Sequence, residues 1–413
     1  MEKPADTLLR WSARWFLVVL PLGVWIRSAF VWLYNPGPFT WADLTHAHSH
    51  TAYFGWAGLG LMGLILYVLP RLTGRSLERP RSLGWLLWLA PWAVLGQLVT
   101  FSLWGYGAAS IAFSGINEVV WFLFAHTFWV NVKGRPVREW PAALWLIGVA
   151  VALLLLSTVG TLLLVIARVM LHTSSAALAN SGVYLFLQAY GDGWLEVGLM
   201  GVATALVGGL RSRSMARWQA LLMLGLMAPA TLRLLVPYGL GGIWVMVGTL
   251  SGLGLGVAQL LYLLNMRQAA GRIPALVRPW WLLAAGALAL KAVLEVLPLL
   301  PAWIVWIDNR SLVIAFLHLK LLLLVSAGLM GAMAYAARVI RGAFGAFTVM
   351  SAVMVGALAA HGFWASANPV LSRQLYLVSF VTGLLAALAA AVAVWPTAFS
   401  RREPAFAATN GAG

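Results

Sequence analysis

The stretch from Thr45 to Arg71, THAHSHTAYFGWAGLGLMGLILYVLPR, decides the fold. Between Thr51 and Pro70 it carries no charged side chain, and about 20 such residues in a helix cross the hydrocarbon core of a bilayer. Three histidines, at positions 46, 48 and 50, precede the apolar run, and an arginine follows it. The stretch therefore predicts a transmembrane helix with imidazole groups at one end.

The rest of the chain repeats this apolar pattern. Of the 413 residues, 62% are hydrophobic and only 9% are charged, which excludes a water-soluble protein. We expect an all-α membrane protein in which residues 1–400 form a single domain of about twelve helices, followed by a short disordered cytoplasmic tail, 401–413. The predicted spans are 13–33, 47–70, 83–105, 115–132, 140–167, 181–209, 218–237, 241–264, 279–304, 312–336, 343–364 and 374–396.

Basic residues predict the orientation of these spans. Every second connection between apolar runs contains Lys or Arg, so the positive-inside rule places both termini in the cytoplasm. The net charge of +16 is thus a topology signal, and we expect contact with lipid and not with nucleic acid. The predicted location is the cell (inner) membrane, as a multi-pass protein.

The chain contains no cysteine. Its absence excludes disulfides, thiolate metal sites, covalently attached c-type haem and a dinuclear copper centre with Cys ligands. Histidine, methionine and carboxylate side chains remain as ligands for redox chemistry or metal binding.

Two spans look like copies of one another. His50 is followed thirteen residues later by Gly63 and seventeen later by Tyr67, and His318 is followed at the same spacings by Gly331 and Tyr335. Because burying an imidazole in a membrane span is costly, a ligand or hydrogen-bond role is the default interpretation, and the matching positions of this pair favour ligation.

A low-spin b haem with two histidine ligands suits this arrangement. His318 and either His50 or His48 would fill both axial positions of the iron, which favours electron transfer over oxygen binding. Zinc or copper bound by the cluster His46, His48 and His50 is the alternative, but a helix presents at most two of these three side chains to one centre.

The second span, His48 to Trp56 running on to Arg71, and the tenth, Ile314 to Lys320, together resemble subunit I of the haem-copper oxidase superfamily, in its cbb3-type oxidase and nitric oxide reductase branches. The resemblance covers the whole chain. It implies a twelve-helix fold with cytoplasmic termini and a low-spin b haem between spans two and ten.

Ligands of the family's catalytic centre are missing. Phe316 stands where the family has the histidine of its catalytic haem, and the chain has no adjacent His-His pair. In the sixth span, Asp192 and Glu196 resemble the reductase pattern of a metal histidine followed four residues later by a glutamate. These two are the candidate catalytic residues, and Glu196 is the candidate ligand of a nonhaem metal. Two carboxylates suit a hard cation or proton transfer rather than copper, and the residues give no further support for a second haem or a nonhaem metal.

Other buried charges have two interpretations. Lys291 and Glu295 are four residues apart, so we expect an ion pair on one helix face. Asp192 and Glu196 have the same spacing and like charge, so burial predicts that at least one is protonated or metal-bound. Basic side chains near the outer side suit haem propionates or lipid phosphates: Arg27, Arg168, Arg233, Arg310 and Lys320.

We therefore expect a b-haem redox protein that receives electrons from a quinol or a partner subunit, within a respiratory complex and without the family's haem-copper active site. One alternative is an oxidoreductase-like enzyme, a nitric oxide reductase relative or nitric-oxide-stress enzyme with a rebuilt nonhaem metal site. It would use Glu196, Asp192 and either His172 or His361. The other is a non-redox ion- or proton-conducting subunit or scaffold on the same fold.

Overall fold

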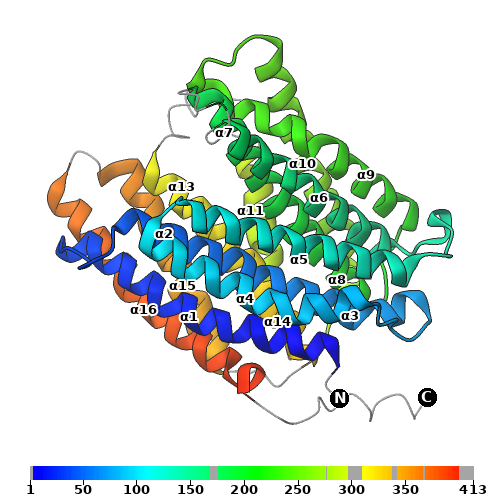
Figure 1. Cartoon of the computed structure of the whole chain (residues 1–413). Helices are drawn as coiled ribbons and strands as arrows, with labels where there is room; N and C mark the ends of the chain where they lie inside the picture. The colour runs from blue at the N-terminus through cyan, green and yellow to red at the C-terminus, as the bar shows by residue number, and fades with distance from the viewer. Residues whose placement is uncertain are drawn as a thin grey trace.

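The computed structural model describes residues 3–167, 171, 175–275, 277–295, 309–336, 342–365 and 368–399. These residues form twelve helical spans, as predicted, and Figure 1 shows them packed side by side in one bundle. In chain order the spans are α1 (Pro4–Trp32); α2 (Trp41–His50), η1 (Thr51–Gly58) and α3 (Leu59–Thr73); α4 (Arg81–Trp104); α5 (Ala108–Val132); α6 (Ala142–Val165); α7 (Ala176–Phe186), η4 (Leu187–Val197) and α8 (Gly198–Leu206); α9 (Arg213–Ala230) and η5 (Thr231–Tyr238); α10 (Ile243–Arg267); α11 (Arg278–Leu294); α13 (Arg310–His318), η8 (Leu319–Ser326) and α14 (Ala327–Ala336); α15 (Gly342–Ala360) and η9 (His361–Ala365); and α16 (Pro369–Phe399).

Ten of these spans are long and apolar enough to cross a membrane, so the chain is a multi-pass membrane protein. The other two are α7–η4–α8, which contains Asp192 and Glu196, and α11, of which 17 residues are described. The predicted tail 401–413 lies outside the described residues, and the single domain of residues 1–400 stays a prediction.

Capping side chains mark the starts of two of the helices that carry histidines. Thr40 accepts a hydrogen bond from the Asp43 backbone at the start of α2, and Asn309 accepts from Ser311 and Leu312 at the start of α13. Short loops between such ends hold neighbouring spans antiparallel. Several helices begin earlier than predicted, because turns that contain charged residues are helical too, such as those with Asp6 and Arg10 in α1.

The second span forms the centre of the bundle. In its most apolar window 89% of the residues are buried, whereas no other candidate span exceeds 61%. Helices α1 and α16, the first and last of the chain, pack against each other (Figure 1, dark blue and red). The histidines of the second span are therefore held by surrounding helices and not by a loop.

The second and tenth spans share a change in helix type. Each is an α-helix that ends on a histidine, at His50 and at His318, and each continues as a π-helical segment, η1 and η8. The indole nitrogen of Trp56 in η1 donates a hydrogen bond to the Ser326 hydroxyl in η8, with an N–O distance of 2.8 Å. The sixth and eleventh spans also contain π-helical segments, η4 and η9, so what the second and tenth share is the position of this change directly after a histidine that ends an α-helix. π-helical turns often occur at functional sites.

Candidate functional site

A cavity of about 230 Å³ lies between the first, second, tenth and twelfth spans. His48 and His318 both line it, from α2 and α13. Arg27 and Arg310 line it as well, whereas most of the remaining walls are apolar. The structure therefore brings together two of the three predicted cofactor ligands and two of the predicted basic groups.

The His318 imidazole has a fixed tautomer. Its Nδ1 lies 2.8 Å from the Ile314 carbonyl oxygen, and because a carbonyl can only accept, Nδ1 must be the donor. The lone pair is then on Nε2, the nitrogen that is free to bind a metal. Metal-binding histidines are commonly oriented by a hydrogen bond of this kind.

The His48 imidazole lies against the first span at a glycine. A Cβ atom at Gly23 would be only 2.7 Å from His48 Cε1, so any larger residue would push the ring away. The Nδ1 atom of His48 is buried without a hydrogen-bond partner in the part of the chain that the structure describes. Buried imidazole nitrogens normally have a partner. Nδ1 of His50 is also buried without one, so it is the position of His48 on the cavity wall that makes His48 the candidate ligand.

His50 does not line this cavity. Its ring stacks on Phe101, with the centroids 4.0 Å apart, and meets Phe54 edge to face at 5.2 Å. His46 packs edge-on against Tyr106 at 4.6 Å. The structure thus separates His46 and His50, on one face of α2, from His48 on the other.

Of the remaining histidines, His361 and His126 are hydrogen-bonded to serine hydroxyls. Both ring nitrogens of His361 are used, by the hydroxyls of Ser311 and Ser372 at 2.8 Å each. His126 is hydrogen-bonded to the Ser82 hydroxyl at 2.9 Å. His172 lies outside the described residues.

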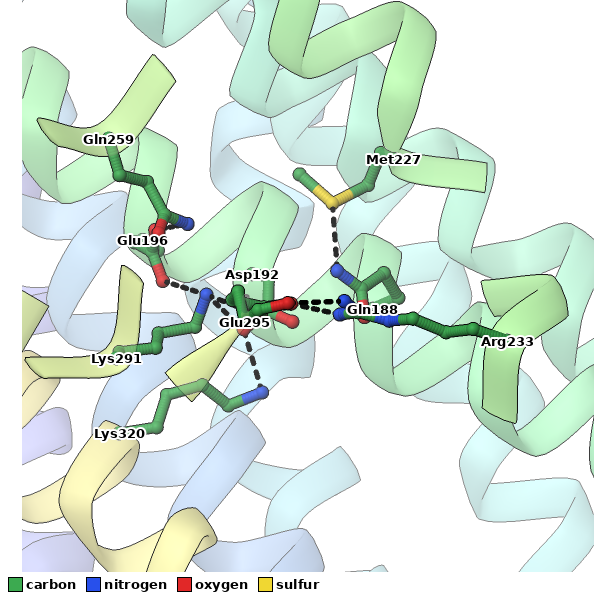
Figure 2. Close-up of polar contacts among 9 residues, drawn as sticks. All are labelled: Gln188, Asp192, Glu196, Met227, Arg233, Gln259, Lys291, Glu295 and Lys320. Carbon is green, nitrogen blue, oxygen red and sulfur yellow. Dashed lines mark hydrogen bonds and ion pairs between the residues drawn. The ribbon is translucent and has the colours of Figure 1, made fainter. Parts of the chain in front are cut away.

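A second feature is a group of buried charged side chains around Asp192 and Glu196 of the sixth span. Lys291 on α11 points its Nζ at three carboxylates, 3.6 Å from Asp192 Oδ1, 3.2 Å from Glu196 Oε2 and 3.1 Å from Glu295 Oε1 (Figure 2). The expected pair of Lys291 and Glu295 is therefore present. The like charges of Asp192 and Glu196 are compensated by an ammonium group from another span, which the sequence did not predict.

Two more cations and an amide complete this group. Lys320 Nζ on η8 lies 2.8 Å from Asp192 Oδ1, and the Arg233 guanidinium on η5 pairs with Glu295. We call the whole group the ionic cluster; its members are Asp192, Glu196, Arg233, Gln259, Lys291, Glu295 and Lys320. Lys320 and Arg233, considered above as partners of haem propionates, are instead bound to carboxylates of this cluster.

Tyr53 connects the cavity with the ionic cluster, and sequence reasoning missed it. Its ring lines the cavity, and its hydroxyl is buried without a hydrogen-bond partner among the described residues. A Cβ atom at Gly191 would lie 2.9 Å from Lys320 Nζ and 3.8 Å from Tyr53 Cε1, so these two side chains meet at this glycine. The only signal in the sequence was a polar aromatic residue within an otherwise apolar run.

The chain is similar in structure to a heme-copper terminal oxidase that was solved as a dimer by cryo-electron microscopy. The TM-score is 0.79, and the match covers 98% of this chain and 86% of that one at 10% sequence identity. No family model matches the chain. No curated protein matches it either. At this level of identity the likeness concerns the fold, so this chain is a multi-pass membrane protein with a heme-copper oxidase-like fold.

Proposed function

We propose that the chain is a membrane redox protein that holds one low-spin b haem between His48 and His318. The observation that carries this proposal is that the second and tenth spans present these two imidazoles to one cavity. The orientation of His318 by Ile314 leaves Nε2 free for the iron. When bound, such a haem supplies one-electron transfer and leaves no open coordination site for a substrate.

The walls of the cavity fit this group. A second, apolar cavity of about 420 Å³ adjoins the first and shares four lining residues with it, Leu20, Val24, Phe380 and Ala387. Cofactor pockets commonly have volumes of roughly 300–1,000 Å³ and mostly apolar walls. The first cavity alone, at about 230 Å³, is smaller than this, so a haem held there would extend into the second. Arg27 and Arg310 would pair with the propionate groups, because guanidinium binds carboxylate in a bidentate manner.

The same cavities favour an electron donor that is soluble in the membrane. The second cavity lies between α1 and α16, and its lining includes Leu384 and Leu388, which are 36% and 56% exposed. On a transmembrane helix, exposed leucines face lipid. A quinol would reach the proposed haem from this side, whereas a partner subunit would have to cover it.

Absorption spectra of the purified protein test the proposal. We expect about one b haem per chain and a reduced low-spin spectrum, both lost in His318→Ala and in His48→Ala. His50→Ala is the matched control, and it should keep the haem because His50 packs on Phe101 away from the cavity. A haem-free protein, or a spectrum that persists in His318→Ala, would contradict the assignment.

Counting haems and metals also separates the alternatives. Two haems, or one haem with a nonhaem metal, would favour the nitric oxide reductase-like enzyme with Glu196 as a metal ligand. A folded, haem-free protein that mediates pH-dependent ion flux in liposomes would favour a conducting subunit.

A further inference from the structure

The ionic cluster is arranged around one atom, the Nζ of Lys291. Three carboxylate oxygens surround it at 3.1–3.6 Å, two from η4 and one from the end of α11. The contact of Nζ with Glu295 is a hydrogen bond, whereas those with Asp192 Oδ1 and Glu196 Oε2 are ion pairs without hydrogen-bond geometry. Hard metal ions hold oxygen ligands at about 2.0–2.6 Å. The distances of 3.1–3.6 Å from Lys291 Nζ to the carboxylate oxygens are those of an ammonium–carboxylate contact and are longer than metal–oxygen bonds.

The formal charges of the cluster balance when all six groups are ionised. Its acidic members are Asp192, Glu196 and Glu295, and its basic members are Lys291, Lys320 and Arg233, so three negative charges face three positive ones. All six side chains are at most 7% exposed. Burying a charge is tolerated only when it is paired, and a divalent cation added to this set would leave an excess of two positive charges.

Hydrogen bonds occupy only part of the cluster's polar atoms: Gln259 Oε1 and Arg233 Nε are buried without a hydrogen-bond partner among the described residues. Gln259 Nε2 donates a hydrogen bond of 2.6 Å to the second oxygen of Glu196. The Lys320 ammonium lies 5.9 Å from the ring centroid of Phe316, on its way to Asp192. The tenth span therefore contributes a second ammonium to the cluster.

We propose that the Lys291 ammonium takes the place of a nonhaem metal ion at the sixth span. It neutralises Asp192 and Glu196 and joins η4 to α11, as a metal bound between the two segments would. An ammonium has no vacant coordination position and does not change its oxidation state, so its role is structural and electrostatic. This inference does not depend on the haem proposed at His48 and His318.

Removing the ammonium tests the proposal. Lys291→Met keeps an unbranched side chain that is one heavy atom shorter, but leaves the cluster with one unbalanced negative charge. Breaking a buried ion pair from one side is costly, so we expect a melting temperature lower by about 10 °C. Mn²⁺ prefers oxygen ligands, and it should bind Lys291→Met at about one ion per chain, visible by electron paramagnetic resonance, and raise the melting temperature. Lys291→Arg, the control that keeps the charge, should gain neither.

A charge-balanced double variant keeps the test decisive if Lys291→Met does not fold. Lys291→Met combined with Glu196→Gln has two acidic and two basic groups, so it should fold and should not bind Mn²⁺. Failure of this double variant to fold would overturn the proposal, as would a Lys291→Met variant as stable as the unsubstituted protein without Mn²⁺. A stoichiometric nonhaem metal in the unsubstituted protein that disappears in Glu196→Gln would also overturn it, whatever the haem content.

Discussion

Two positions along one helix separate the histidine that lines the cavity from the one that packs on Phe101. At about 100° per residue, His48 and His50 point roughly 200° apart. The repeat of spacings in the sequence aligns His50 with His318, but alignment of two spans does not decide which face of each turns toward the other. The rotation of the second span brings His48 into the cavity.

Gly23 gives a prediction about His48. A side chain at this position would collide with His48 Cε1, so Gly23→Val should tilt the ring and reduce the haem content at least several-fold. Haem per chain, measured on purified protein, checks this. The control is Gly84→Val, where a Cβ atom meets nothing within 4 Å and haem content should not change. Equal haem content in Gly23→Val would argue against His48 as a ligand.

An ion pair within one helix could be predicted from the sequence, whereas an ion pair between two spans could not. The pair of Lys291 and Glu295 was predictable, because residues four apart on a helix are neighbours. The pairing of Lys320 with Asp192 was not, since it joins two spans separated by more than a hundred residues. In spans that are apolar on all sides, periodicity does not fix which face is buried, so contacts between spans stay undetermined.

Whole elements were more predictable than their internal geometry. The twelve apolar runs correspond to the twelve spans, because length and hydropathy dictate where a chain can cross a membrane. The π-helical segments η1, η4, η8 and η9 were missed. Nothing in their composition distinguishes i→i+5 from i→i+4 hydrogen bonding, and π-helical turns persist where tertiary packing favours them.

Packing between α6 and α7 gives a prediction at the scale of elements. A Cβ atom at Gly160 would lie 2.6 Å from the Phe186 backbone nitrogen and 2.7 Å from the Gly182 carbonyl oxygen, and backbone atoms cannot move aside. Gly160→Val should therefore separate the helices, cost about 1–3 kcal/mol, and lower the melting temperature. Gly115→Val, in open space on α5, is the control and should have little effect. A melting temperature unchanged by Gly160→Val would show that the two backbones are not in close contact.

At the scale of the molecule, the arrangement of helices tolerates almost complete change of sequence. The likeness to the oxidase, with a TM-score of 0.79, rests on 10% identity. Membrane helices associate through close packing and a few polar contacts, which many sequences satisfy. The number and rough positions of the spans were therefore predictable from hydropathy, whereas the contacts between spans in the ionic cluster were not.

The orientation of the molecule in the membrane is a prediction that the chain makes easy to test. Because it has no cysteine, any single introduced cysteine is the only thiol. Asn35 and Ser76 are exposed in loops at opposite ends of the second span. With cytoplasmic termini, Asn35→Cys should react with a membrane-impermeant maleimide in intact cells, and Ser76→Cys only after permeabilisation.

The unsubstituted chain is the control for this labelling and should not react. The reverse pattern would invert the topology and place the cavity of His48 and His318 toward the cytoplasm.

A side-chain ammonium, unlike a bound metal ion, does not have to be acquired after the chain is synthesised. The Lys291 ammonium arrives with translation and cannot dissociate, exchange for a competing ion or be removed by a chelator. Its place between η4 and α11 is therefore filled at any concentration of free metal. If the ammonium stands in for a metal, this half of the bundle matures without a metal-delivery protein and is immune to occupation by the wrong metal.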